Sequence, residues 1–197
     1  DFRLHQSLKS LGKSYEYQII YVDDGSTDNS NLLLNNLSQN ERTELVTLRA
    51  NFGKSMALLA GFQKSKGELI ISIDSDLQDF PEDIPKLIDH MIKDNSDVVC
   101  GWRSQRKDTL SKRLVSKLYN KTIKIVTGLE IHDHNCGLKL YKKRVISQIS
   151  VYGQLHRYLA LQAHLAKFKV TECKIRNAPR KFGESKYPTI RYEGIFD

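Results

Sequence analysis

Short apolar runs alternate with helical patterns along this chain, and each run has the length of a β-strand. The runs occupy residues 18–22, 45–48, 69–73 and 98–100. Strands of a parallel sheet are buried on both faces and read as continuous apolar segments, with the helices between them covering the sheet. The alternation therefore predicts an α/β fold in which a mostly parallel sheet is flanked by helices.

Helical patterns are expected in four places. They cover residues 55–66, ending at Gly67; the segment after the third strand; residues 111–127, ending at Gly128; and residues 155–167. The second helix has the clearest apolar stripe, formed by Ile84, Leu87, Ile88, Met91 and Ile92. An extended segment at 170–175 and a loop rich in Pro, Gly, Lys and Arg through Pro188 complete the pattern.

Composition narrows the class of protein. The 197 residues, 40% of them hydrophobic, suffice for one well-buried core, so a single domain is expected. The net charge of +8 indicates an anionic partner, which is nucleic acid, a membrane surface or a phosphorylated small molecule. The 3 cysteines form no C-x-x-C pair and suit a reducing compartment. We expect neither a signal peptide nor a membrane span, which requires roughly 18 to 20 apolar residues.

Two carboxylates, Asp74 and Asp76, end the third apolar run. In an extended segment residues i and i+2 point to the same side, so both carboxylates are expected to face one ion. Mg²⁺ and Mn²⁺ take one or two protein carboxylates and fill their other positions with water and phosphate oxygens. The pair therefore predicts a divalent metal site for a phosphorylated substrate; a solvated loop that happens to contain two Asp is the alternative.

A second acidic cluster, Asp23-Asp24-Gly25-Ser26, follows the first apolar run. Ligands of open parallel sheets bind outside the carboxyl ends of the strands, so both clusters are expected to line one crevice. Taken alone, this cluster is typical of a turn that ends in a helix cap at Ser26, Thr27 or Asp28.

A helix start is indicated just after the two carboxylates. Asp79 followed three residues later by Glu82 resembles a capping box, and Pro81 suits a first helical turn. By this interpretation Asp79 is only a helix cap.

Ordered motifs run along nearly the whole chain. They are VDDGSTD at 22–28, RANFGK at 49–54, DSDLQDFPE at 74–82, HD at 132–133 with CGLK at 136–139, GQLHR at 153–157 and RKFGESKY at 180–187. Together they resemble the motifs of the family 2 glycosyltransferases, in particular the polyprenyl-phosphate and dolichyl-phosphate sugar synthases. Phe80 replaces the first Pro of the family's D-x-D-L-Q-D-P-P-E signature, which is expected to loosen the turn.

The resemblance implies that residues 1–197 form a catalytic domain with a GT-A-like, Rossmann-like fold. The family opens with a strand that ends in a P-x-Y-N-E-like turn, which nothing before Leu4 supplies, and relatives of this type continue into C-terminal membrane helices. We therefore expect a soluble fragment without its first strand and membrane helices, taken from a protein that works at the cytoplasmic face of a membrane. Self-association into a homo-oligomer stays open.

The resemblance also implies an inverting transfer of a sugar from a nucleotide-diphosphate donor to a polyprenyl monophosphate, undecaprenyl or dolichyl. Mg²⁺ or Mn²⁺ on Asp74 and Asp76 would stabilise the leaving diphosphate, with Asp76 and Asp133 as catalytic residues. An alternative keeps the donor chemistry but uses a polysaccharide or other soluble hydroxyl acceptor, which needs a general base. A nucleic-acid-binding module is disfavoured because no helix-turn-helix, zinc or RNA-binding signature is present. The sequence identifies neither the sugar nor the nucleotide nor the lipid length.

Two sets of binding residues follow from these motifs. The nucleotide sugar is assigned to Asp23, Asp24, Gly25, Ser26, Asn51, Lys54, Asp74, Ser75, Gln78, Arg180 and Lys186. The acceptor phosphate is assigned to Arg103, Arg106, Arg113, His156, Arg157 and Ser185. Local alternatives are a solvated Gln78, a loop-capping Asp133 and a core histidine at His156.

Overall fold

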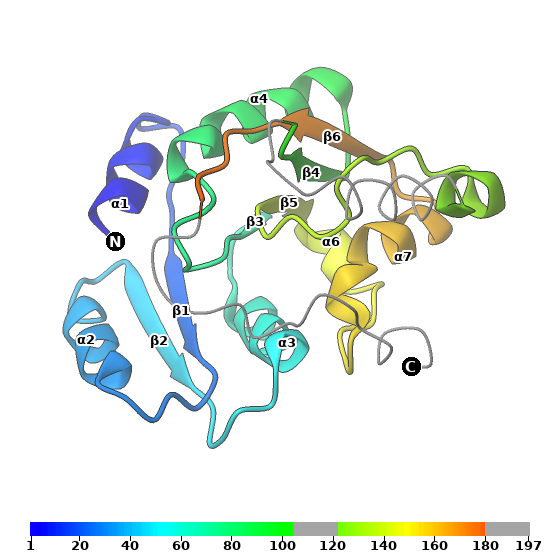
Figure 1. Cartoon of the computed structure of the whole chain (residues 1–197). Helices are drawn as coiled ribbons and strands as arrows, with labels where there is room; N and C mark the ends of the chain where they lie inside the picture. Colours follow the sequence, from blue (N-terminus) through cyan, green and yellow to red (C-terminus); the bar gives the residue numbers. More distant parts are fainter. Residues whose placement is uncertain (105–121, 180–197) are drawn as a thin grey trace.

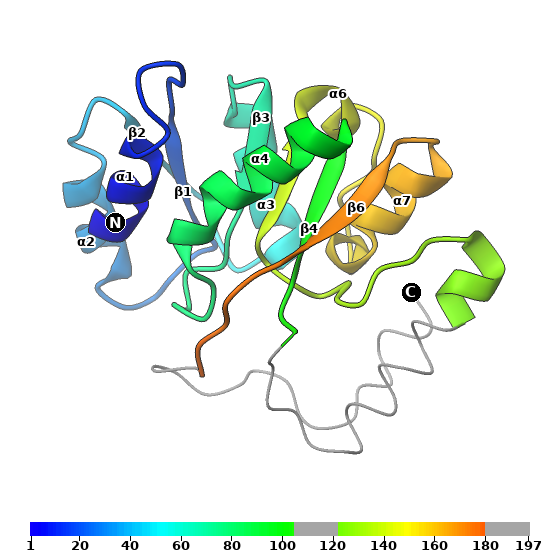
Figure 2. The ribbon, with the colours of Figure 1, turned by 90° about the horizontal axis from the view of Figure 1, so that it is seen from above.

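The computed structural model describes residues 1–104 and 122–179 (Figures 1 and 2). Its labelled helices are α1 (Phe2–Lys9), α2 (Ser30–Leu37), α3 (Lys54–Lys64), α4 (Ile84–Asp94), α6 (Lys143–Ile146) and α7 (Leu159–Leu165). Its strands are β1 (Ile19–Asp23), β2 (Thr43–Thr47), β3 (Leu69–Ser72), β4 (Val98–Trp102), β5 (Lys139–Lys142) and β6 (Val170–Lys174). Two 3₁₀ turns, η1 (Pro81–Asp83) and η2 (Leu155–Arg157), precede α4 and α7.

The described strands form a parallel pair, β1–β2, and a four-stranded sheet in the order β3-β5-β4-β6. In the larger sheet β4 and β6 are parallel, whereas β5 is antiparallel to both of its neighbours. The five predicted extended segments are confirmed, with their ends shifted by one or two residues. The apolar pattern did not predict β5, because this strand has only four residues and a lysine at each end.

Apolar side chains form two core clusters, one on each side of the larger sheet. On one side α4 contributes Ile84, Leu87, Ile88 and Met91, next to α1 (Figure 1). On the other side lie Phe62 of α3 and Leu159, Ala160 and Ala163 of α7. Side chains alternate along β5, so Leu140 joins the first cluster and Tyr141 joins the second. Complete burial of one such side chain contributes about 1.5–3 kcal/mol, and the two clusters hold the sheet between its helices.

Most predicted helices are confirmed, with differences at their ends. In α4, Ile92 is 63% exposed, because it lies in the last turn, one position round from the buried stripe. The helix predicted at 55–66 starts one residue earlier and ends at Lys64, before Gly67. The pattern at 155–167 is divided into η2 and α7.

The helix predicted at 111–127 is described only in part. Residues 122–127 are helical and end before Gly128, as expected, while residues 111–121 lie outside the described ranges. Gly128 has φ 77°, a left-handed conformation that favours glycine after a helix. Within residues 1–104 and 122–179, no helix combines the length and apolar character needed to cross a membrane.

Phe80 lies between two guanidinium groups. The Cζ atoms of Arg3 and Arg176 lie 5.1 and 5.0 Å from its ring centroid. Arg3 also forms an ion pair with Glu82 at 2.7 Å, and Arg176 forms one with Asp83 at 2.9 Å. The expectation that Phe80 loosens the turn is therefore wrong, because its ring ties η1 to α1 and to the chain after β6.

Replacing Phe80 tests this clamp. We expect Phe80→Leu to lower the free energy of unfolding by about 1–2 kcal/mol, since leucine keeps an apolar side chain but has no π face for the two cations. Urea denaturation measures the change. Phe2→Leu is the control because Phe2 is 78% exposed. Equal stability of Phe80→Leu and the parent protein would contradict the clamp.

Candidate functional site

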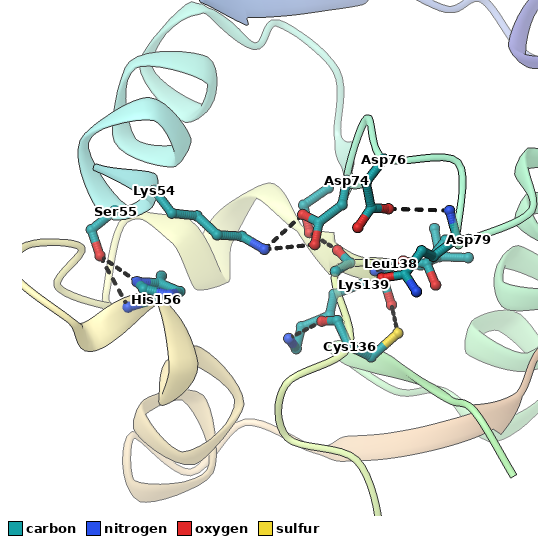
Figure 3. A network of polar contacts seen from close by, with 12 residues as sticks. Lys54, Ser55, Asp74, Asp76, Asp79, Cys136, Leu138, Lys139 and His156 are labelled. Carbon is teal, nitrogen blue, oxygen red and sulfur yellow. Dashed lines mark hydrogen bonds and ion pairs between the residues drawn. The ribbon is translucent and has the colours of Figure 1, made fainter. Parts of the chain in front are cut away.

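Asp74 and Asp76 lie in a turn beyond the carboxyl end of β3 (Figure 3). The strand ends at Ser72, and the chain turns at Ser75. The backbone N–H of Gln78 donates a hydrogen bond to Asp76 Oδ1 at 3.1 Å, which closes the turn. The expected extended geometry of the two acids is therefore wrong, although both lie at the predicted edge of the sheet.

Lys54 provides a cation for Asp74. Its ammonium donates to both carboxylate oxygens, at 2.6 and 2.8 Å (Figure 3). The backbone N–H groups of Phe52 and Gly53, just before Lys54, donate to the two oxygens of Asp24 at 2.8 and 2.9 Å. Asp24 thus fixes the loop that brings Lys54 to Asp74, and the two acidic clusters are connected through this loop.

The rest of the first acidic cluster shapes this loop. Gly25 has φ 68°, and a Cβ added there would lie 2.4 Å from the carbonyl carbon of Ala50. Asp23 is buried, and its Oδ1 accepts the backbone N–H of Ser26 at 3.0 Å. Hydrogen bonding with Ser26 holds the pKa of Asp23 below its ordinary value.

The helix cap expected at Ser26, Thr27 or Asp28 is present at Asp28, whose Oδ1 accepts the backbone N–H of Ser30, the first residue of α2, at 2.9 Å. The N-cap of α2 is Asn29, and its side chain makes no capping hydrogen bond. The capping side chain therefore belongs to the residue just before the N-cap position.

Gly137, two residues before β5, lies directly against Asp74. A Cβ on Gly137 would lie 2.4 Å from Asp74 Cγ, so any other residue would displace the carboxylate. The hydroxyl of Ser72 donates to the carbonyl of Gly137 at 2.9 Å. The chain that leads into the antiparallel strand β5 therefore forms one wall of the turn that holds the acids.

Asp79 is buried beside this turn, and it is not the predicted helix cap. Phe80 is the N-cap of η1, while Asp79 Oδ2 accepts the backbone N–H of Leu138 at 3.1 Å. The other oxygen of Asp79 has no hydrogen-bond partner among the residues that the structure describes. Burial raises the pKa of Asp79 to about 6; the charge of Arg103 opposes the rise, and the charges of Asp74 and Asp76 add to it. Three carboxyl groups therefore interact within this turn.

Asp133 and Arg103 form an ion pair after β4. The guanidinium donates to both carboxylate oxygens, at 2.7 and 3.0 Å, and the two side chains are 12% and 10% exposed. Next to them, the rings of Trp102 and His132 stack with centroids 4.2 Å apart. The structure thus brings together two residues that were predicted separately, one for catalysis and one for the acceptor phosphate.

His156 lies in η2 against the N-terminal turn of α3. Its Nδ1 is 2.9 Å from the Ser55 hydroxyl, which also accepts the His156 backbone N–H at 3.2 Å (Figure 3). Burial and then the charges of Lys54 and Arg157 lower the pKa of His156 to about 4. The imidazole is therefore neutral at physiological pH.

The remaining predicted residues fall into two groups. Asn51 and Ser75 are exposed, and the carbonyl of Gln78 accepts the backbone N–H of Ala178 at 2.9 Å. The assignments that lie outside the described residues are Arg106, Arg113, Arg180, Ser185 and Lys186.

Sequence reasoning missed three residues here: Asp79 as a buried carboxyl group, Gly137 against Asp74, and Lys139 as a buried residue of β5. All three depend on β5, whose position between β3 and β4 leaves no periodic signal. Motif position could have found Gly137 and Lys139, because both lie in the CGLK segment.

The described residues fit a divalent ion. Asp74 and Asp76 supply two carboxylates, and a cation, the Lys54 ammonium, already contacts both oxygens of Asp74. Within residues 1–104 and 122–179, no group of three His, Cys, Asp or Glu could enclose a metal. An open pair of carboxylates suits Mg²⁺ or Mn²⁺, which complete their coordination with water and substrate phosphate oxygens.

Solved structures with the same architecture support the predicted GT-A-like α/β fold. Glucosyl-3-phosphoglycerate synthase from Mycobacterium tuberculosis, in complex with Mn²⁺, UDP-glucose and phosphoglyceric acid, is 15% identical with a TM-score of 0.66, covering 92% of this chain and 67% of that one. The same enzyme in complex with phosphoglyceric acid is 16% identical with a TM-score of 0.68, and the match covers 90% of this chain and 66% of that one. S. aureus TarS 1-349 is 16% identical with a TM-score of 0.59, and the match covers 87% of this chain and 53% of that one. The chain thus spans about two thirds of the synthase and about half of the TarS fragment.

The model of the family "Glycosyl transferase family 2" matches residues 3–150, well over half of this chain. The chain therefore belongs to glycosyl transferase family 2. The predicted enzyme class, glycosyltransferase, is confirmed at the level of the family, and the single-domain fold agrees with it.

Replacing Lys54 tests whether its ammonium competes with a metal ion for Asp74. Without nucleotide sugar, we expect Lys54→Met to raise the affinity for Mn²⁺ by up to about fivefold, because the ammonium no longer competes for Asp74 and a partly exposed ion pair contributes about 0.2–1 kcal/mol. Isothermal titration calorimetry measures the affinity. Lys64→Met is a matched control on the same helix, where Lys64 pairs with Glu44 at 3.1 Å. Weaker or unchanged Mn²⁺ binding by Lys54→Met would contradict the competition.

The raised pKa of Asp79 predicts a pH-dependent stability. Between about pH 4 and pH 6 the folded protein holds a proton on Asp79 that the unfolded chain releases, so stability falls as the pH rises through this range. At pH 7.5 with a chelator, we expect Asp79→Asn to be more stable than the parent by up to about 3 kcal/mol, and equally stable near pH 4. Urea denaturation across pH checks this, with exposed Asp89→Asn as the control. Parallel pH profiles of Asp79→Asn and the parent would exclude it.

Proposed function

We propose that this chain transfers a sugar, with inversion, from a nucleotide-diphosphate donor to a polyprenyl monophosphate, undecaprenyl or dolichyl. One observation carries the proposal: carboxylates and cations converge at one edge of the sheet. Lys54 contacts Asp74, and the charges of Arg103, Asp74 and Asp76 all act on Asp79. Such an edge binds a metal-bound diphosphate on the acids and a second phosphate on the cations.

The donor side uses Asp74, Asp76 and Lys54. Asp74 and Asp76 would hold Mg²⁺ or Mn²⁺, which when bound neutralises charge that grows on the leaving diphosphate. Lys54 offers a point charge to the diphosphate oxygens, and Asp24 fixes the backbone that carries Lys54. The Mn²⁺ and UDP-glucose named for the solved synthase make a uridine diphosphate sugar the first donor to try.

The acceptor side uses Arg103, held by Asp133. A phosphate monoester has a second pKa of about 6, so the attacking oxygen is already ionised at neutral pH and needs no strong base. A hydroxyl acceptor would need one, but both oxygens of Asp133 accept hydrogen bonds from Arg103. This pairing favours a phosphate acceptor, with Asp133 orienting the guanidinium, over the polysaccharide alternative.

A polyprenyl phosphate resides in a lipid bilayer, so the proposal places the reaction at a membrane surface, on the cytoplasmic face where nucleotide sugars are made. The phosphoglyceric acid named for the solved synthase is a soluble acceptor that also carries a phosphate. A soluble phosphorylated acceptor is therefore the specific competitor that the experiment has to include.

The test is a transfer assay with a panel of nucleotide sugars, offered polyprenyl phosphate, phosphoglyceric acid or a sugar alcohol. We expect product on polyprenyl phosphate only, and a loss of about a hundredfold or more in kcat for Asp74→Asn and Asp76→Asn, because the leaving charge is no longer stabilised. Exposed Asp89→Asn is the control. Unchanged turnover of both variants, or transfer to phosphoglyceric acid or the sugar alcohol but not to polyprenyl phosphate, would refute the proposal.

A further inference from the structure

Lys139 is a buried cation at the edge of the sheet that carries the site. It is the first residue of β5, paired in register with Ser72 of β3 and Cys100 of β4. Because β5 runs antiparallel, its first residue lies beside the last residue of β3, two positions before Asp74. Lys139 is 5% exposed, and alternation along β5 puts it on the same face as Tyr141.

The Lys139 ammonium is incompletely partnered. It has three N–H donors, and among the described residues it donates only to the carbonyl of Cys136. No carboxylate of the described residues pairs with it. Lys142, at the other end of the same strand, does form an ion pair, with Asp97 at 3.2 Å. A buried charge without a counter-charge is unfavourable, so an anion brought by a ligand would stabilise it.

Two other positively charged side chains, Lys54 and Arg157, act on the same histidine as Lys139 does. Figure 3 shows the Lys139 side chain on the side of β5 that faces Lys54 and His156. The charges of Lys54, Arg157 and Lys139 all act on the imidazole of His156, which stays neutral. Lys54 is engaged by Asp74, whereas Lys139 has two N–H groups to offer.

We propose that Lys139 is a substrate-binding residue whose ammonium contacts an oxyanion, a phosphoryl oxygen of the donor diphosphate or of the acceptor phosphate. The inference rests on the proposed function for the identity of the phosphate. The same chemistry serves both sources, because a lysine is a compact point charge that binds phosphate oxygens without a fixed fork geometry. Burial in a low-dielectric wall strengthens this contact relative to one with a surface lysine.

The experiment measures anion binding to the whole chain by isothermal titration calorimetry, with inorganic pyrophosphate plus Mn²⁺ and, separately, with inorganic phosphate. We expect Lys139→Met to weaken the binding of at least one anion by about tenfold or more, and Lys139→Arg to retain most of it because the charge remains. The matched control is Lys142→Met on the same strand, where Asp97 keeps its contact with Arg144. The control should bind both anions like the parent protein.

The two arms identify the source of the phosphate. A loss confined to pyrophosphate assigns Lys139 to the donor diphosphate, and a loss confined to phosphate assigns it to the acceptor. Parent-like affinity of Lys139→Met for both anions, equal weakening by Lys142→Met, or no binding of either anion by the parent would overturn the inference.

Thermal unfolding without anions separates binding from a structural role. We expect Lys139→Met to match or exceed the parent's melting temperature, because the variant removes a buried and unpaired charge. A lower melting temperature together with unchanged anion affinity would mean that Lys139 only supports the fold. The outcome does not depend on sugar transfer, so failure of the proposed polyprenyl acceptor in the transfer assay leaves this measurement decisive.

Discussion

The site depends on one constraint, the insertion of an antiparallel strand between two strands that run the other way. β5 is hydrogen-bonded to β3 on one side and to β4 on the other, so its amino end lies at the edge where those strands end. The chain at this end then contacts the acidic turn: Gly137 lies against the Asp74 carboxylate, and the backbone N–H of Leu138 donates to Asp79. Lys139, the first residue of β5, is paired in register with Ser72 of β3. A strand parallel to β3 and β4 would have its carboxyl end, and not its amino end, at this edge.

Charge at this edge is balanced in pairs, and the pairs have different consequences. Lys54 and Asp74 are each 36% exposed, so their ion pair contributes little to stability and can yield to a metal. Arg103 and Asp133 are far more buried, so separating them would be unfavourable. Among residues 1–104 and 122–179, neither Asp79 nor Lys139, both of them buried, forms an ion pair, so both are sensitive to an added cation or anion. The neutral His156 adds no further charge to this balance.

Individual residues show which features of the structure could be predicted from the sequence alone and which could not. The buried stripe of α4 and the strand before Asp74 were predictable, because periodicity reports directly on burial. The roles of Asp79 and Phe80 were not, because both look like local features of a helix start. Asp79 accepts from Leu138 across 59 positions, and Phe80 packs between Arg3 and Arg176. Contacts between segments so distant in the chain leave no local pattern.

The sequence by itself determined the α/β class, the carboxylates at the end of a strand, and the ordered motifs that indicated the family. These features are local, since burial periodicity and residue chemistry are written into consecutive positions. Only the tertiary structure decided which groups meet: Lys54 with Asp74, Arg103 with Asp133, Ser55 with His156. It also decided that Lys139 is buried, because the direction and neighbours of a four-residue strand follow from the pairing of the whole sheet.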